Sequence, residues 1–366
     1  MTKKLFEHLQ ISDYTLKNRV IMAPMTRGRC GDDGTPDTLV ADYYAQRSSA
    51  GLIITEATAI NNRGHGWPGA PGIFTNHQQA GWKTVADAVH QQNGRIFMQI
   101  WHMGRALLSE SIGGLKPLAP SPIAAIGEIP NKQGVPTGFD IPEPMNQKQI
   151  EDTVKDFANA GRRAIDAGLD GIEIHAANNF LIDAFLRDGS NQRSDNYGGS
   201  VENRCRFLFE VVDAVTDAIG SDKVGVRLSP TNAVFGISDS NPEAIFTTAA
   251  RGLSERHLAY LHILEPANGS DTYLSTDTPT ISHILRDNYD GVFILNGSLT
   301  QQTGNAAIQS GAADAVAFGI PYIANPDLVE RFRDGIELAE PDRDTFYTPG
   351  AEGYTTYPKA AGRDAS

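Results

Sequence analysis

Eight short runs of apolar and β-branched residues recur along the chain, and a stretch of helical character lies between most of them. The runs are VIMAP from Val20, LIITEATAI from Leu52, IFMQIW from Ile96, GIEIH from Gly171, VGVRLS from Val224, YLHILEP from Tyr260, VFILNG from Val292 and AVAFG from Ala315. Such runs predict buried strands, and their alternation with helices predicts a parallel α/β sheet. With eight repeats in 366 residues, we expect a closed (β/α)8 barrel rather than an open, doubly wound sheet.

Several of the intervening stretches have the length and pattern of helices. They are residues 37–50, 77–92, 148–168 and 200–220. In the third stretch, Ile150, Val154, Phe157 and Ile165 recur near the helical spacing, and Gly168 stands where a C-terminal cap is expected. These stretches predict the outer helices of the barrel.

Three segments do not fit the repeat. Residues 3–19 predict a hairpin that plugs the bottom of the barrel, and residues 341–366 form a polar tail that returns to its mouth. Residues 103–146 are rich in Gly, Pro and Ser and follow the third strand, so they form a long excursion on the catalytic face. We expect residues 1–366 to form one domain.

Composition excludes several classes of protein. The formal net charge of −13 argues against nucleic acid and anionic membrane as partners. Cys30 and Cys205 are too few and too far apart for a disulfide framework, a cysteine-rich zinc site or a four-cysteine iron–sulfur cluster. No motif predicts a metal site. The first residues lack the apolar core of a signal peptide, and no run is long enough to span a membrane, so we expect a cytoplasmic protein.

Polar side chains end many of the predicted strands. These residues, together with the apolar Ala57 and Trp101, are Thr26, Arg27, Glu56, Gln99, His102, His175, Asn178, Arg227, Ser229, His262 and Glu265. In a barrel the C-terminal ends of the strands open onto the catalytic face. Any single residue in this set is more often a plain strand end in water, but the whole set on one face predicts an active site.

The last two strands end in glycine. Gly297-Ser298 and Gly319-Ile320 each precede a predicted helix, and backbone N–H groups at such turns bind phosphate. Ordinary turns that need glycine for close packing explain the same pattern equally well.

Gln99 offers an amide group and Arg227 offers a planar, positively charged guanidinium group, and both side chains can face the barrel cavity. That pair suits a ring edge made of amide and carbonyl groups that gains negative charge on reduction, as the pyrimidine edge of a flavin does. An internal ion pair between Arg227 and Glu173 is the alternative, and both can hold at once.

Several longer motifs resemble one family. They are APMTR at 23–27, GLIITEAT at 51–58, QIWHMGR at 99–105, GIEIHAAN at 171–178, RSDNYGGSVENR at 193–204, IANPDLVERF at 323–332 and AEGYTTYP at 351–358. In this order they resemble the Old Yellow Enzyme family of FMN-dependent ene-reductases, and most closely the bacterial N-ethylmaleimide and xenobiotic reductases. The resemblance covers residues 5–358 and implies a TIM barrel that binds one FMN.

The resemblance also implies roles for individual residues. Ala23, Pro24, Met25, Thr26 and Ala57 would line the flavin, Gln99 and Arg227 would hold its pyrimidine edge, and Gly297, Ser298, Gly319 and Ile320 would offer backbone to its phosphate. His175 and Asn178 match the pair that grips the carbonyl or nitro oxygen of the substrate. Thr26, Trp67, Trp101, Phe180 and Tyr354 match positions that line the substrate pocket.

The activity implied is the NADPH- or NADH-driven reduction of α,β-unsaturated carbonyls, maleimides and nitroalkenes by a ping-pong cycle. Hydride would pass from flavin N5 to the β-carbon of the substrate. Two other functions stay open at this point. One is a flavin-free barrel lyase or isomerase with a phosphorylated substrate, although no lysine occurs in the eight strand runs. The other is a flavin redox sensor without turnover.

Three positions depart from the usual family pattern. Phe180 replaces the tyrosine that protonates the α-carbon, so water or another side chain would deliver that proton. Ile320 replaces an arginine that helps to hold the phosphate, which predicts weaker retention of FMN. Trp67 stands where close relatives often have tyrosine and would narrow the pocket.

Overall fold

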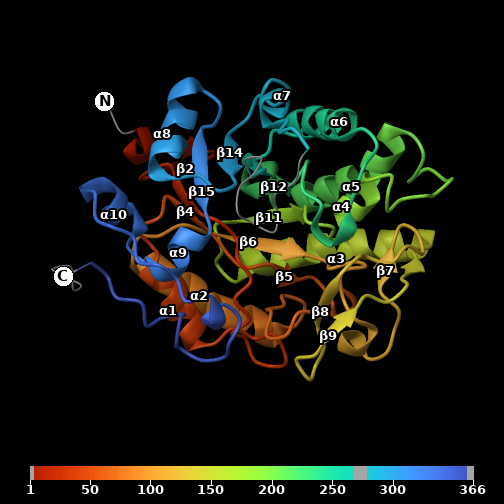
Figure 1. The fold of residues 1–366 in the computed structure, drawn as a ribbon, viewed down its shortest axis with the longest axis horizontal. Helices are drawn as coiled ribbons and strands as arrows, with labels where there is room; N and C mark the ends of the chain where they lie inside the picture. Colours follow the sequence, from red (N-terminus) through yellow and green to blue (C-terminus); the bar gives the residue numbers. More distant parts are fainter. Residues whose placement is uncertain (1–3, 267–277, 361–366) are drawn as a thin grey trace.

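The computed structural model describes residues 4–266 and 278–360, so residues 1–3, 267–277 and 361–366 lie outside the description (Figure 1). The eight predicted runs form eight parallel strands. They are β3 (Val20–Met22), β4 (Leu52–Ile54), β6 (Ile96–Trp101), β11 (Gly171–Ala176), β12 (Val224–Leu228), β13 (Tyr260–Leu264), β14 (Phe293–Asn296) and β15 (Ala315–Phe318). Each pairs with the next, β15 pairs with β3, and β6 pairs with β11, so the sheet closes on itself. The predicted barrel is confirmed.

Helices surround the strands (Figure 1). They are α1 (Thr38–Gln46), α2 (Asn76–Gln91), α3 (Gln147–Asp166), α4 (Leu181–Leu186), α5 (Val201–Ile219), α6 (Pro242–Ser254), α7 (Ser282–Arg286), α8 (Gln301–Ser310), α9 (Ile320–Ala324) and α10 (Leu328–Asp334). The four predicted helices are α1, α2, α3 and α5. Thr75 and Asn146 begin α2 and α3 as reciprocal capping boxes. Gly168 follows α3 with φ +95°, a conformation that favours glycine.

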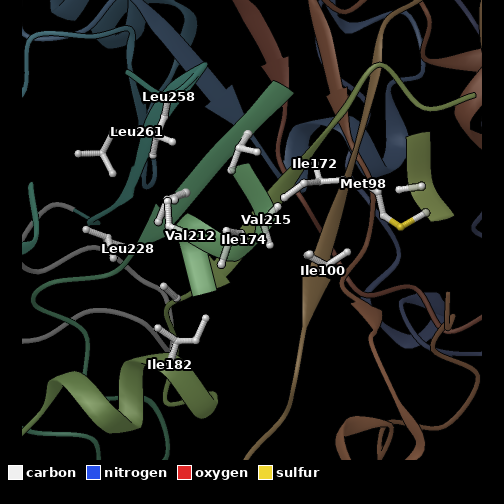
Figure 2. Close-up of a cluster of buried hydrophobic side chains, with 14 of the residues drawn as sticks. Met98, Ile100, Ile172, Ile174, Ile182, Val212, Val215, Leu228, Leu258 and Leu261 are labelled. Carbon is white, nitrogen blue, oxygen red and sulfur yellow. The ribbon is translucent and has the colours of Figure 1, made fainter. Parts of the chain in front are cut away.

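Side chains alternate along the strands between the helix layer and the interior of the barrel. Figure 2 shows the outer set, in which Ile172 and Ile174 of β11 lie in one apolar cluster with Val212 and Val215 of α5. Glu173 and His175 therefore have the opposite parity and point into the barrel. The same alternation directs Gln99, Arg227 and His262 inward from β6, β12 and β13.

The predicted hairpin closes the bottom of the barrel. After η1 (Lys4–Phe6), strands β1 (Leu9–Ile11) and β2 (Tyr14–Leu16) pair in antiparallel register. Leu9, Ile11 and Leu16 form one buried cluster with barrel residues that include Phe97 and Tyr260. The N-terminal ends of the strands are thus sealed with apolar side chains, which leaves the opposite end for a site.

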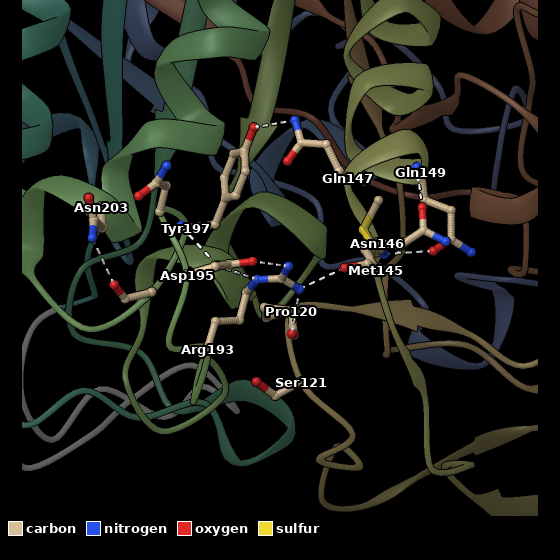
Figure 3. A network of polar contacts seen from close by, with 12 residues as sticks. Pro120, Ser121, Met145, Asn146, Gln147, Gln149, Arg193, Asp195, Tyr197 and Asn203 are labelled. Carbon is tan, nitrogen blue, oxygen red and sulfur yellow. Dashed lines mark hydrogen bonds and ion pairs between the residues drawn. The ribbon is translucent and has the colours of Figure 1, made fainter.

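The excursion after β6 carries short elements only: η3 (Ser109–Ile112), β7 (Leu118–Ala119), β8 (Glu128–Pro130), β9 (Pro136–Gly138) and β10 (Glu143–Pro144). Arg193 binds two backbone carbonyls of this excursion (Figure 3). Its Nη1 donates to the carbonyls of Pro120 and Met145, at 3.1 and 2.7 Å, while its other nitrogens pair with Asp195. The motif RSDNYGGSVENR therefore begins with a residue that holds the excursion in place.

The other short elements are β5 (Thr58–Ala59), η2 (Asn62–Gly64), η4 (Ser221–Lys223), η5 (Val234–Gly236) and η6 (Arg343–Thr345). The tail after α10 crosses back over α1 and is held by buried arginines. Arg27 donates to the carbonyls of Phe346 and Gly353, and Arg29 donates to those of Thr345 and Phe346. No helix in the described part of the chain combines the length and apolar character needed to cross a bilayer.

Candidate active site

His175 is the last but one residue of β11 and a neutral hydrogen-bond donor. The backbone N–H of Ala177 donates to its Nδ1 at 3.3 Å, so the proton of the neutral ring lies on Nε2. Burial, aided by the positive charge of Arg227, holds the pKa of His175 well below its usual value. The ring is therefore uncharged at neutral pH and offers Nε2–H.

Asn178 follows in a left-handed turn. Asn178 and Asn179 have φ of +58° and +64°, which asparagine tolerates better than most residues with a side chain. The backbone N–H of Asn178 donates to Ser229 Oγ at 2.8 Å, and its Oδ1 accepts from Asn232 Nδ2 at 2.7 Å. Because its oxygen is engaged in this way, the side chain of Asn178 presents its Nδ2 donors to a ligand.

The side chain of Asn179 makes structural hydrogen bonds at the end of β11. Its Oδ1 accepts from Arg105 Nε at 2.9 Å, and its Nδ2 donates to the carbonyl of Phe235, also at 2.9 Å. The fully buried side chain thereby joins the end of β11 to the excursion and to η5. Of the two adjacent asparagines, the second fixes the turn, while the first keeps its amide nitrogen available.

Aromatic rings enclose His175. The Trp101 ring lies nearly parallel to it with centroids 6.1 Å apart, and the Phe180 ring meets it edge-on at 4.8 Å. Trp101 and Phe180 also contact each other at 4.5 Å. The structure thus brings together His175, Trp101 and Phe180, with Ala57 and Trp67 in the same apolar cluster.

The structure does not support a substrate-lining role for Tyr354. Its ring has no exposed surface and stacks on Tyr43 with centroids 4.0 Å apart, beneath the guanidinium groups of Arg27 and Arg29. A side chain packed on all sides cannot face a substrate. The tail residue that contacts Trp67 is Tyr347, which is 55% exposed and meets that ring at 5.4 Å. Tyr347 was not predicted, although it stands in the same tail.

Gln99 and Arg227 belong to one buried network. Gln99 Nε2 donates to Glu173 Oε1 at 2.7 Å, and Arg227 Nη2 donates to Asn296 Oδ1 at 2.6 Å. The other oxygen of Glu173 accepts from His262 Nδ1 at 2.8 Å. Burial opposes ionisation of Glu173, yet the hydrogen bond from His262 and the positive charge of Arg227 keep its pKa below the usual value. The charge of Arg227 thus acts on Glu173, while an ion pair between the two side chains stays a prediction.

The small residues predicted to line a flavin lie at the C-terminal ends of β3 and β4. Ala23, Pro24 and Ala57 are buried, while Met25 and Thr26 are half-buried. The backbone N–H of Ala23 donates to the carbonyl of Phe318 at 2.9 Å, which places this wall beside Gly319. A Cβ on Gly319 would lie 3.5 Å from Met25 Sδ, an ordinary contact, so packing within the chain does not require glycine there.

Gly297 differs from Gly319. It has φ +141°, and a Cβ there would lie 2.4 Å from the carbonyl oxygen of Glu265, so the fold itself requires glycine. The helix after it begins only at Gln301, and Thr300 caps its first turn. Donors for a phosphate at this end would therefore come from the backbone around Ser298 and Gly319, and Ile320 is 45% exposed beside them.

These residues fit FMN. Gln99 and Arg227 supply an amide and a cation for the pyrimidine edge, Ala23 and Ala57 are small side chains, and Gly297 and Gly319 follow the last two strands. Among residues 4–266 and 278–360, no cluster of three or more His, Cys, Asp or Glu side chains is arranged to hold a metal ion. The flavin fits the donor set that the chain presents.

Known proteins match this chain over nearly its whole length. The model of the NADH:flavin oxidoreductase / NADH oxidase family matches residues 4–339. A probable flavin mononucleotide-dependent alkene reductase of Leishmania infantum is 40% identical over 97% of both chains.

Solved structures agree. The Old Yellow Enzyme homologue of Zymomonas mobilis superposes with a TM-score of 0.95 at 43% identity, covering 97% of this chain and 99% of that one. Morphinone reductase in complex with tetrahydroNAD superposes with a TM-score of 0.91 at 44% identity, covering 99% of each chain. The particular likeness to N-ethylmaleimide reductases stays a prediction, but the wider resemblance is confirmed: the chain belongs to the NADH:flavin oxidoreductase / NADH oxidase family, as an FMN-dependent homologue of the Old Yellow Enzymes.

Proposed function

We propose that the protein is a cytoplasmic ene-reductase that uses NADPH or NADH to reduce C=C bonds conjugated to a carbonyl or nitro group. Its substrates would be α,β-unsaturated carbonyls, maleimides and nitroalkenes. The observation that carries the proposal is the pair of neutral donors at the end of β11, His175 Nε2 and Asn178 Nδ2, beside the Gln99–Arg227 edge. Bound FMN supplies the hydride chemistry, as acceptor from the nicotinamide and as donor to the β-carbon of the alkene.

The donor pair would bind the oxygen of the activating group. Negative charge grows on that oxygen as the β-carbon gains hydride, so donors fixed in advance stabilise the transition state more than the ground state. Mutations of comparable donors cost about 3–4 kcal/mol of barrier. The half-buried rings of Trp67 and Phe180, with Trp101, would limit water around the substrate, which strengthens these hydrogen bonds.

The α-carbon must then receive a proton, and Phe180 cannot give one. Its ring contacts both Trp101 and His175, which places it beside the proposed oxygen-binding pair. His175 is needed as a neutral donor, so we assign protonation to water. Phe180→Tyr should raise turnover of nitroalkenes several-fold and lower the solvent isotope effect, because it restores a hydroxyl at this position.

The matched control for that variant is Phe139→Tyr. It adds the same hydroxyl in the excursion, where the ring packs on Phe235 and not on Trp101. Stopped-flow measurement of the oxidative half-reaction in H2O and D2O would compare both variants with the native enzyme. If Phe180→Tyr changed neither the rate nor the isotope effect, the assignment to water would fall.

The function itself is tested by the anaerobic visible spectrum through addition of NADPH and then 2-cyclohexenone. Flavin bands that bleach with NADPH and return with the enone support the proposal. Bands that bleach and return with neither the enone nor a nitroalkene would indicate a flavin protein without alkene turnover. A protein that stays colourless with added FMN would contradict flavin chemistry and favour a barrel lyase or isomerase with a phosphorylated substrate.

A further inference from the structure

The buried carboxylate of Glu173 lies at the centre of the barrel and is not itself expected to touch a substrate. It joins three strands: Gln99 of β6 donates to one of its oxygens and His262 of β13 donates to the other. Glu173 and His262 have no exposed surface, and Gln99 and Arg227 are nearly as buried. A carboxylate in such a place needs compensation, which the two hydrogen bonds and the nearby Arg227 provide.

Glu173 determines which way the amide of Gln99 faces. A carboxylate without a proton only accepts hydrogen bonds, so the nitrogen of the amide, and not its oxygen, must point to Glu173. One N–H of Gln99 is used in this bond at 2.7 Å. The second N–H and Oε1 are left with fixed directions. A flavin pyrimidine edge, which has carbonyl oxygens beside an N–H, requires that amide in one orientation only.

The charge states of the network follow from its contacts. Burial lowers the pKa of His262, so this ring is neutral and donates from Nδ1. Burial and the charge of Glu173 together raise the pKa of Tyr260, which lies two residues before His262 on β13. Arg227 is positive, and its Nη2 is held by Asn296, whose Nδ2 in turn donates to the carbonyl of Ala317 at 2.8 Å. The network thus holds one negative and one positive charge.

We propose that Glu173 is a positioning residue for FMN: it fixes the amide of Gln99 and, by partly cancelling the charge of Arg227, keeps the flavin harder to reduce. This inference rests on the FMN site and on the proposed role of Gln99 and Arg227. Its electrostatic part has a definite sign. Loss of a negative charge near a group that gains negative charge favours the reduced form. Removal of the Glu173 charge should therefore move the midpoint potential of the flavin to a more positive value.

Glu173→Gln, reconstituted with FMN, should show that positive shift when its potential is measured by equilibration with a reference dye. Asp170→Asn is the matched control. Asp170 is also a buried carboxylate, paired with His90 and Arg95, but it precedes β11 at the sealed end of the barrel. Its variant should keep the native potential. A native potential in Glu173→Gln would overturn the electrostatic part of the proposal.

Glu173→Asp tests whether Glu173 positions the amide of Gln99. It also keeps the proposal testable if Glu173→Gln does not fold. It keeps the charge but withdraws the carboxylate from Gln99 by one methylene. We expect a several-fold higher Kd for FMN, measured by quenching of flavin fluorescence, with a potential close to the native one. An unchanged Kd would overturn the positioning role. If the native protein itself binds no FMN, the proposed function fails instead, so the two failures are distinguishable.

Discussion

A hydrogen bond from Asn232 fixes the orientation of the Asn178 side chain. Asn232 is 2% exposed and donates from Nδ2 to Asn178 Oδ1 at 2.7 Å, which turns the amide nitrogen of Asn178 toward the site. Asn232→Leu keeps the side-chain volume but removes that bond. We expect kcat/KM for 2-cyclohexenone to fall about tenfold, the worth of one hydrogen bond. The Kd for FMN should not change, and a fall in FMN affinity of the same size would contradict the assignment.

Ile320 leaves an apolar side chain where a phosphate is expected. It is 45% exposed and directly follows Gly319. Ile320→Arg should lower the Kd for FMN about tenfold, because a charge-assisted hydrogen bond to phosphate is worth about 1.5–3 kcal/mol before solvent screening. Riboflavin lacks the phosphate and provides the control, since its Kd should not change. Equal effects on both flavins, or none on FMN, would show that residue 320 does not face the phosphate.

Candidate residues that stand at the end of a strand could be predicted from the sequence. His175, Gln99 and Arg227 were predicted because the inward parity of a barrel strand fixes where its polar residue points. Asn232 was not predicted, because it lies in a loop whose path depends on contacts made after folding. The prediction that Tyr354 lines the substrate pocket failed for the same reason. The tail has no periodicity, so nothing in its sequence indicates that Tyr354 is buried and Tyr347 exposed.

At the scale of elements, Arg47 anchors the tail without contacting the candidate site. Its fully buried guanidinium donates to the carbonyls of Tyr322, Ile323 and Tyr354, at 3.0, 2.9 and 3.4 Å, and to that of Tyr43 within α1. It also lies over the ring of Tyr43, with Cζ 3.7 Å from the centroid. One side chain thereby joins α1, α9 and the tail.

Arg47→Met should lower the free energy of unfolding by about 2–4 kcal/mol, because it leaves several buried carbonyls without donors. Urea denaturation would measure the loss, and limited proteolysis should show faster cleavage within residues 341–358. Arg256→Met is the control, since Arg256 pairs with the half-exposed Asp213. If the two variants were equally stable, the buried anchor would contribute no more than a surface pair.

The elements themselves were largely predictable. Eight strand runs, four helices and the hairpin were found, because hydrophobic spacing and glycine at turns are local signals. The anchoring of the excursion and the tail was not. Arg193 and Arg47 bond to backbone carbonyls, which every residue has, so no pattern of side chains in the sequence identifies their partners.

At the scale of the whole molecule, buried histidines set the response to acid. Burial lowers the pKa of His102 to about 3 and also lowers those of His65, His175 and His262. Below their unfolded pKa of about 6.5, the unfolded chain binds protons that the folded chain excludes, so stability falls as the pH falls. Each such histidine contributes up to about 1.4 kcal/mol per pH unit.

Urea denaturation at pH 7.5, 6.5 and 5.5 should therefore show a decline that begins near pH 6.5, before most carboxylates protonate. His102→Asn should make the decline shallower, because asparagine does not titrate in this pH range. The variant should still fold, since its amide oxygen can accept the N–H of Gly104 that Nδ1 now accepts at 3.0 Å. A variant with the native slope would exclude His102 as a source of the decline.

The pair that closes the barrel joins its first strand in the sequence, β3, to its last, β15. Val20 of β3 lies opposite Val316 of β15, and the wall made by Ala23 and Met25 stands against Gly319. A protein is synthesised from its N-terminus, so β3 must wait for its partner until synthesis has passed Phe318. A nascent chain that stops short of Phe318 therefore has no closed ring, and the proposed FMN site is completed only after β15 has been made.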